Sequence, residues 1–90
     1  ETSGHVPGHQ SVLVRLPETG AILLTIDAVP FAAGFTRDEQ DDGGSTDAEA
    51  IRASTIKLLD RVEQDQIGLV IFGHEDEQWK TLRQAPEFYD

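Results

Sequence analysis

The sequence contains no cysteine and no methionine. Without cysteine there is no disulfide framework, so the fold depends on its own core. Because methionine is absent, we expect that the chain does not begin at its own initiator residue. No basic segment followed by an apolar one marks a signal peptide, and a cytoplasmic location is therefore expected.

Long apolar runs and basic residues are also scarce. The longest apolar run, residues 21–26, is far shorter than the roughly 20 residues that span a bilayer. Seven Lys and Arg residues stand against 17 Asp and Glu residues, which gives a net charge of −10. This charge repels phosphate backbones and anionic lipids, so neither nucleic acid nor a membrane is an expected partner.

The residues that are present suit one folded unit. A length of 90 residues allows a single modest core. A hydrophobic fraction of 38% and a charged fraction of 27% are typical of a folded chain rather than a disordered one.

The first half of the sequence predicts a β-hairpin. Residues 11–16 alternate in hydrophobicity and are rich in β-branched side chains, which favours a strand. A turn signal, Pro-Glu-Thr-Gly, follows at residues 17–20. The apolar run at residues 21–26 is typical of a strand that is covered on both faces.

The second half predicts a helix, a strand and a short helix. Residues 36–46 are polar and acidic, which predicts an exposed loop. Thr46 and Glu49 match a capping box, with Asp47 adding negative charge at the helix N-terminus. The apolar stripe of this helix comprises Ile51, Thr55, Leu58, Leu59 and Val62. A strand at residues 68–72 and a short helix at 76–84, with Trp79 and Leu82 on one side, complete a β-β-α-β-α order of the α/β (α+β) class.

Three side chains that can bind metal ions lie next to the predicted strands. His5 lies in the loop before the first strand, Asp27 follows the second and His74 follows the third. Imidazole and carboxylate together suit zinc and similar metals. Each residue also has a plainer interpretation, namely a turn residue, a cap and a residue that merely precedes a helix. Taken singly, none of the three decides between these readings.

Longer motifs around these residues resemble a known family. The stretches "GHVPGHQS", "LLTIDA" and "FGHEDEQW", with the closing "APEFY", resemble the C-terminal half of the metallo-β-lactamase superfamily and, within it, the N-acyl homoserine lactonases. The resemblance covers residues 1–90 and implies half of an αββα sandwich. It implies that His5 is a ligand of one metal, that Asp27 bridges two metals and acts in catalysis, and that His74 is a ligand of the second metal. His9 is then expected to support the site rather than to bind metal.

The same resemblance implies a function in quorum quenching. It implies a bacterial hydrolase with two zinc ions that opens the lactone ring of an N-acyl homoserine lactone. The remaining ligands, on a His-x-His-x-Asp-His motif, are absent from this sequence. We therefore expect weak or no zinc binding and little activity from these residues alone, and either a missing N-terminal half or self-association to cover the exposed sheet.

One departure from the family pattern affects the substrate. Such lactonases often carry tyrosine three residues after the bridging aspartate, where this chain has Pro30. Phe31 and Phe35 are candidates to line an acyl-chain pocket, although a role in the core is the commoner one for aromatic residues.

Two other functions remain open at the level of sequence. Another hydrolase of the same fold, such as a glyoxalase II-like thioesterase or an aryl esterase, would share His5, Asp27 and His74. A non-catalytic module that binds a partner through its acidic surface would need none of them as metal ligands.

Overall fold

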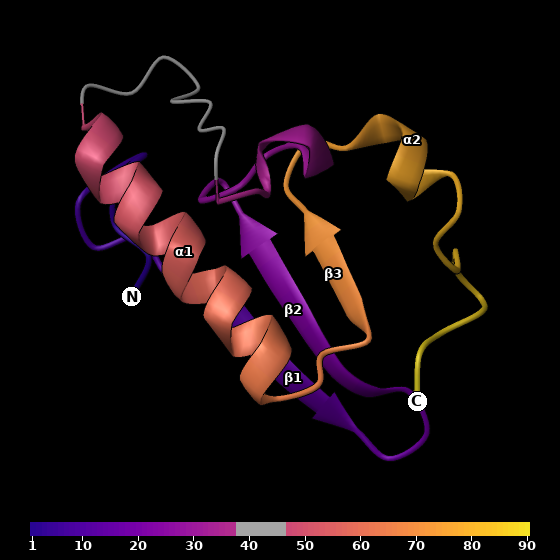
Figure 1. The fold of residues 1–90 in the computed structure, drawn as a ribbon. Helices are drawn as coiled ribbons and strands as arrows, with labels where there is room; N and C mark the ends of the chain where they lie inside the picture. Colours follow the sequence, from indigo (N-terminus) through magenta and orange to yellow (C-terminus); the bar gives the residue numbers. More distant parts are fainter. Residues whose placement is uncertain (38–46) are drawn as a thin grey trace.

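A three-stranded sheet forms the centre of the protein. The structure is a computed structural model, which describes residues 1–37 and 47–90. Its elements are β1 (Val12–Leu16), β2 (Gly20–Ile26), the short 3-10 helix η1 (Ala32–Gly34), α1 (Ala48–Gln64), β3 (Leu69–Phe72) and α2 (Asp76–Trp79) (Figure 1). The predicted order is confirmed, and each predicted strand agrees with the observed one to within a residue at either end. The 3-10 helix was not expected from the sequence.

Strand β2 lies in the middle of the sheet. It pairs with β1 as an antiparallel hairpin and with β3 in parallel, so the strand order is β1-β2-β3. The parallel pair needs a crossover connection, which α1 supplies (Figure 1). Because β2 and β3 run in the same direction, the residues that follow them, Asp27 and His74, come out at the same end of the sheet.

Helix α1 packs on one face of the sheet. Its predicted stripe is confirmed, since Ile51, Thr55 and Leu58 are buried. The core that it forms with the sheet comprises Ala21, Leu23, Ala28, Val29, Leu58 and Ile67. Burying a Leu or Ile side chain stabilises a fold by about 1.5–3 kcal/mol, so these apolar contacts hold the helix against the strands.

The start of α1 is capped by an aspartate. The carboxylate of Asp47 accepts a hydrogen bond from the backbone N–H of Ala50 at 2.9 Å. The sequence predicted Thr46 as the cap and Asp47 only as a nearby negative charge, so the cap lies one residue later than predicted. Thr46 and most of the predicted loop at residues 36–46 lie outside the described residues. Next to that stretch, Arg37 donates to Asp60 on α1 at 2.7 Å, and this hydrogen bond raises the pKa of Arg37 above its ordinary value.

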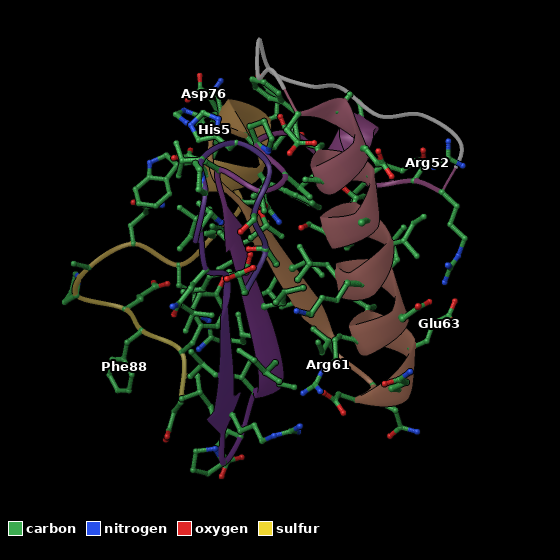
Figure 2. The ribbon with its side chains drawn as sticks, turned by 90° about the vertical axis from the view of Figure 1, so that its left-hand side faces the viewer. His5, Arg52, Arg61, Glu63, Asp76 and Phe88 are labelled. Carbon is green, nitrogen blue, oxygen red and sulfur yellow. The ribbon has the colours of Figure 1, made fainter. Side chains whose placement is uncertain are left out.

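The C-terminal segment runs on the side of the sheet away from α1. Figure 2 shows α1 and this segment on opposite sides of the strands, with Phe88 facing outward. The segment ends at the β1–β2 turn, where the backbone N–H groups of Glu18 and Thr19 donate to the carbonyl oxygen of Asp90 at 2.9 and 2.6 Å. The chain end thus holds the hairpin.

Helix α2 is shorter than predicted. The sequence favoured residues 76–84, but the helix ends at Trp79. The side chain of Gln84 donates to the carbonyl oxygen of Trp79 at 2.9 Å, while the N–H of Arg83 donates to the hydroxyl of Tyr89. A continued helix needs the carbonyl of Trp79 to accept from the N–H of Arg83, but that carbonyl accepts from the N–H of Leu82 at 3.2 Å and from Gln84 instead.

Candidate metal centre

Each of the three histidines follows a glycine, and two of these glycines are required by close packing. A Cβ atom on Gly4 would lie 2.7 to 2.9 Å from Ile51 of α1, and Gly4 has φ +150°. Side chains rarely tolerate either condition. Gly4 therefore lets the loop that carries His5 rest directly on the first turn of α1.

Gly73 brings the ends of two strands together. A Cβ atom there would lie 2.3 Å from the carbonyl oxygen of Ile26, so only glycine allows this approach. Ile26 itself has φ +56°, a strained value for a β-branched residue, and the β2–β3 register shifts between Leu24 and Ile26. This irregular strand end turns Asp27 toward His74.

Asp27 lies between the two predicted histidine ligands. Its Oδ1 atom is 2.9 Å from Nε2 of His74, and its Oδ2 atom is 3.9 Å from Nε2 of His5. The three side chains are open to solvent, with 37% of Asp27, 44% of His5 and 65% of His74 exposed. Residues from three separate segments thus meet at one end of the sheet, with one carboxylate oxygen directed to each imidazole.

This donor set fits zinc. Two ligand atoms at about 2.0–2.2 Å from a tetrahedral zinc ion lie roughly 3.4 Å apart. The two nitrogen-to-oxygen separations of 2.9 and 3.9 Å fall on either side of that value. The pair His5–Asp27 and the pair His74–Asp27 each supply only two donors. Within residues 1–37 and 47–90, no group of three or more His, Cys, Asp or Glu residues is placed to hold a metal ion. Three donors from the protein are usual even in a catalytic zinc site.

His9 contacts the backbone of Asp27 rather than its carboxylate. The N–H of Asp27 donates to Nε2 of His9 at 3.3 Å, while Nδ1 of His9 is 2.9 Å from Oγ1 of Thr2. His9 is thereby occupied on both sides of its ring. This placement is the one expected of a supporting residue.

The segment after Asp27 is fastened to the segment that carries His74. The N–H of His74 donates to the carbonyl oxygen of Pro30 at 2.9 Å, and the N–H of Ala32 donates to Glu75 at 3.0 Å. Phe31, which is 44% exposed, lies beside His74 with ring centroids 6.5 Å apart. Phe31 thus lies at the edge of the candidate metal centre.

Phe35 packs elsewhere. Its ring meets that of Phe72 edge to face at 5.4 Å, and it contacts the core beneath α1. Of the two roles that the sequence left open for Phe35, the contacts in the structure are those of a core residue.

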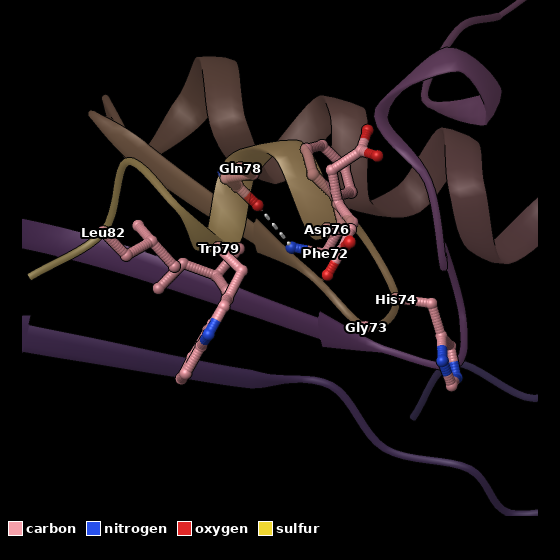
Figure 3. A pocket seen from close by; sticks show the side chains of 9 residues that line it. Phe72, Gly73, His74, Asp76, Gln78, Trp79 and Leu82 are labelled. Atoms are coloured by element: carbon pink, nitrogen blue, oxygen red, sulfur yellow. Dashed lines mark hydrogen bonds between the residues drawn. The ribbon is translucent and has the colours of Figure 1, made fainter. Parts of the chain in front are cut away.

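A cavity of about 310 Å³ adjoins His74 on the α2 side. Trp79 and Leu82 both line it, as Figure 3 shows, although Leu82 lies beyond the end of α2 rather than on the predicted helix. The amide of Gln78 accepts from the N–H of Phe72 at 3.1 Å and donates to the carbonyl oxygen of Val70. Gln78 therefore pairs with β3 as a neighbouring strand does.

The supporting polar residues were missed at the level of sequence. Ser11, Glu75 and Gln78 lie within the stretches that carry the resemblance, but they were given no role there, and Thr2 lies outside those stretches. Thr25 did give a signal, because it is the one hydroxyl in the apolar run at residues 21–26. It is fully buried and donates to the carbonyl oxygen of Val29 at 2.7 Å, which shapes the turn around Asp27.

Comparison with known proteins agrees with this fold. No protein-family model matches the chain. The N-acyl homoserine lactonase AttM of Rhizobium radiobacter is 35% identical over 91 residues, which cover 98% of this chain and 33% of that protein. The N-acyl homoserine lactonase AiiA of Bacillus thuringiensis subsp. kurstaki is 39% identical over 87 residues, covering 97% and 34% respectively. The chain thus spans about a third of the length of the curated relatives that it matches.

Solved structures lead to the same family. A quorum-quenching N-acyl homoserine lactone hydrolase matches with a TM-score of 0.87 and 36% identity over 98% of this chain and 35% of that one. Another such hydrolase, with the product N-hexanoyl-L-homoserine bound at its catalytic metal centre, matches with a TM-score of 0.83 and 34% identity over 98% and 34% of the two chains. The chain therefore has part of a metallo-β-lactamase fold. Within that class it is similar to the N-acyl homoserine lactonases, and the resemblance drawn from the sequence is confirmed.

No helix among the described residues is long and apolar enough to cross a membrane.

Proposed function

We propose that this chain is a C-terminal part, about a third of the length, of a quorum-quenching N-acyl homoserine lactonase that uses two zinc ions. The observation that carries the proposal is the position of Asp27, with one carboxylate oxygen toward His74 and the other toward His5. A carboxylate with this placement suits a ligand shared by two metals. The relatives named as lactonases, which match almost the whole chain, supply the reaction class.

In this proposal His5 and His74 hold different ions and Asp27 holds both. Zinc, when bound, supplies Lewis acidity, which acidifies water and polarises a carbonyl group. The close approach of Gly73 to Ile26 and the hydrogen bond to His9 fix the backbone of Asp27, so its carboxylate would be held in place to act as the shared ligand. Phe31 lies at the rim, where an apolar ring offers a contact surface to an acyl chain.

The 90 residues alone are expected to be inactive. Each ion receives one imidazole and a share of one carboxylate from this chain, which is fewer donors than a catalytic zinc site requires. The other ligands come from the rest of the proposed enzyme. Zinc binding by the isolated chain is therefore expected to be weak, and a turnover rate near that of the complete enzyme would contradict the proposal.

Replacing Asp27 in the complete protein tests the shared-ligand role. We expect Asp27→Asn to lower zinc content and to reduce lactone hydrolysis by at least about 100-fold, since a neutral amide binds zinc poorly. Asp60→Asn is the matched control, because it also removes a carboxylate from an exposed ion pair, on the far part of α1. Elemental analysis and a lactone-opening assay give the two readouts. Normal zinc and normal activity in Asp27→Asn would overturn the assignment.

Position 30 lacks the tyrosine hydroxyl that such lactonases often carry, so a second substrate class is included in the activity test. Position 30 is proline, and its carbonyl oxygen is engaged with the N–H of His74. A hydrolase of the same fold that acts on thioesters or aryl esters would use the same His5, Asp27 and His74. Comparing kcat/KM for an N-acyl homoserine lactone, a thioester and an aryl ester in the complete protein separates these activities. We expect the lactone to be the best of the three.

A further inference from the structure

A continuous series of hydrogen bonds runs from Asp27 into the interior. The N–H of Asp27 meets Nε2 of His9 at 3.3 Å, and Nδ1 of His9 meets Oγ1 of Thr2 at 2.9 Å. Oγ1 of Thr2 is 2.9 Å from Oγ of Ser11, which donates to the carbonyl oxygen of Thr25 at 3.0 Å. The His5 loop and Ser11, which directly precedes β1, are thus joined to the backbone of β2 through hydrogen bonds of side chains.

Only one direction of donation satisfies every bond in this series. A peptide N–H can only donate, so Nε2 of His9 carries no proton and accepts. A neutral imidazole then has its proton on Nδ1, which donates to Thr2. Because Ser11 donates to a carbonyl oxygen, Thr2 must donate to Ser11. The arrangement therefore specifies the Nδ1–H tautomer of His9.

The same residues close the loop that carries His5. The backbone N–H of Thr2 donates to the carbonyl oxygen of His9 at 2.7 Å, parallel to the side-chain contact between these residues. Thr2 is only 4% exposed. In addition, Ser54 on α1 donates to the carbonyl oxygen of Ser3 at 2.7 Å. Thr2 and His9 therefore hold the two ends of the His5 loop together.

We propose that Thr2, His9 and Ser11 are positioning residues, which fix the distance between His5 and Asp27 by holding His9 in its Nδ1–H tautomer. The consequence for metal binding rests on the proposed function, whereas the tautomer does not. Two partners favour this tautomer: the N–H of Asp27, which can only donate to Nε2, and the hydroxyl of Thr2, which accepts from Nδ1 while it donates to Ser11. Without the hydroxyl of Thr2, the proton on Nδ1 has no acceptor, and only the N–H of Asp27 still favours the Nδ1–H form.

Nitrogen-15 NMR of the histidine rings in the complete protein tests the tautomer directly. At a pH above about 8, where a typical imidazole is neutral, we expect His9 to show its proton on Nδ1. Thr2→Val, which keeps the shape and removes the hydroxyl, should shift His9 toward the Nε2–H form. Thr2→Ser, which keeps the hydroxyl, should restore the Nδ1–H form. An Nε2–H signal for His9 in the unaltered protein would overturn the proposal, whatever the activity of that protein.

Two substitutions of His9 test its effect on metal. Gln can place an acceptor near the position of Nε2, and so can keep the bond from Asp27, whereas Asn reaches only the position of Nδ1. We expect His9→Asn to weaken zinc retention against a chelator by about 10- to 100-fold, the range typical of residues that orient metal ligands. His9→Gln should weaken it less, while the two variants unfold at similar temperatures. Equal zinc retention in both variants would contradict a positioning role.

These two experiments separate the inference from the proposed function. If the protein binds zinc and opens lactones, but His9 is in the Nε2–H form, the inference fails and the function stands. If His9 is in the Nδ1–H form, but His5 and His74 can be replaced without loss of zinc, the proposed function fails. The claim that Thr2, His9 and Ser11 position metal ligands then fails as well.

Discussion

At the scale of single residues, Gly73 has the clearest structural role. Its missing side chain lets the end of β3 lie against the carbonyl group of Ile26, and this contact places His74 beside Asp27. We expect Gly73→Ala to lower the free energy of unfolding by about 1–3 kcal/mol, because backbone atoms cannot move aside as a flexible side chain can. Urea unfolding measures this change, and zinc retention by the complete protein should fall as well.

Gly68→Ala is the control for that substitution. Gly68 lies one residue before the same strand, and a Cβ atom there would meet nothing within 4 Å. The free energy of unfolding of this variant should lie within about 0.5 kcal/mol of that of the unaltered protein. If the two alanine variants were equally stable, the close approach at Gly73 would not matter.

The candidate site was predictable residue by residue only where a motif carries chemistry. His5, Asp27 and His74 were singled out because imidazole and carboxylate groups border the predicted strands and because the motifs around them resemble those of the lactonases. Thr2 and Ser11 were not found, since a hydroxyl group becomes informative only when its partners in space are known. Asp27 illustrates the limit: the sequence placed it after β2, but the turn that aims it depends on Ile26 at φ +56° and on the approach of Gly73.

At the scale of secondary-structure elements, the periodicity of the sequence predicted the long helix and the strands. It failed for the short helices, whose ends depend on single contacts. The stripe of α1 and the alternation of β1 each repeat over several residues, so one exception does not change the outcome. Helix α2 is a single turn, and a few local contacts replace its next turn: the carbonyl of Trp79 accepts from the N–H of Leu82 and from the side chain of Gln84. The η1 turn at Ala32–Gly34 likewise follows from local contacts of the 29–35 segment with residues 73–75 rather than from any pattern.

Gln78 provides a test at this scale. Its side-chain amide pairs with the N–H of Phe72 and the carbonyl group of Val70, on the edge of β3 away from β2 (Figure 3). Leucine has a similar size and no polar atoms. We therefore expect Gln78→Leu to lower the local free energy of opening at Phe72 by about 1 kcal/mol, which corresponds to a roughly fivefold faster amide exchange there. Gln78→Glu keeps an acceptor for Phe72 and should slow that exchange relative to the leucine variant. Unchanged exchange in Gln78→Leu would show that solvent replaces the amide fully.

At the scale of the whole molecule, charge and exposed apolar surface oppose each other. The net charge of −10 keeps copies of the chain apart. However, six large apolar side chains are exposed, namely Val6, Val12, Ile26, Phe31, Trp79 and Phe88. Within the described residues, the outer edge of β1 has no strand paired with it, and Val12 lies on that edge. Such an edge favours pairing with another chain.

These two effects predict how the 90-residue chain associates with itself. Because salt screens the repulsion between copies and leaves apolar contacts in place, we expect the mean mass from light scattering to rise as salt increases from about 0.05 to 0.5 M. Val12→Lys should reduce this association, since a lysine on an edge strand is one of the devices that block edge pairing. Val6→Lys is the matched control, because Val6 is similarly exposed, at 47% against 43%, but lies in a loop outside the sheet. If both substitutions changed the association equally, the added charge and not the strand edge would be the cause. A single monomeric species at every salt concentration would contradict the prediction.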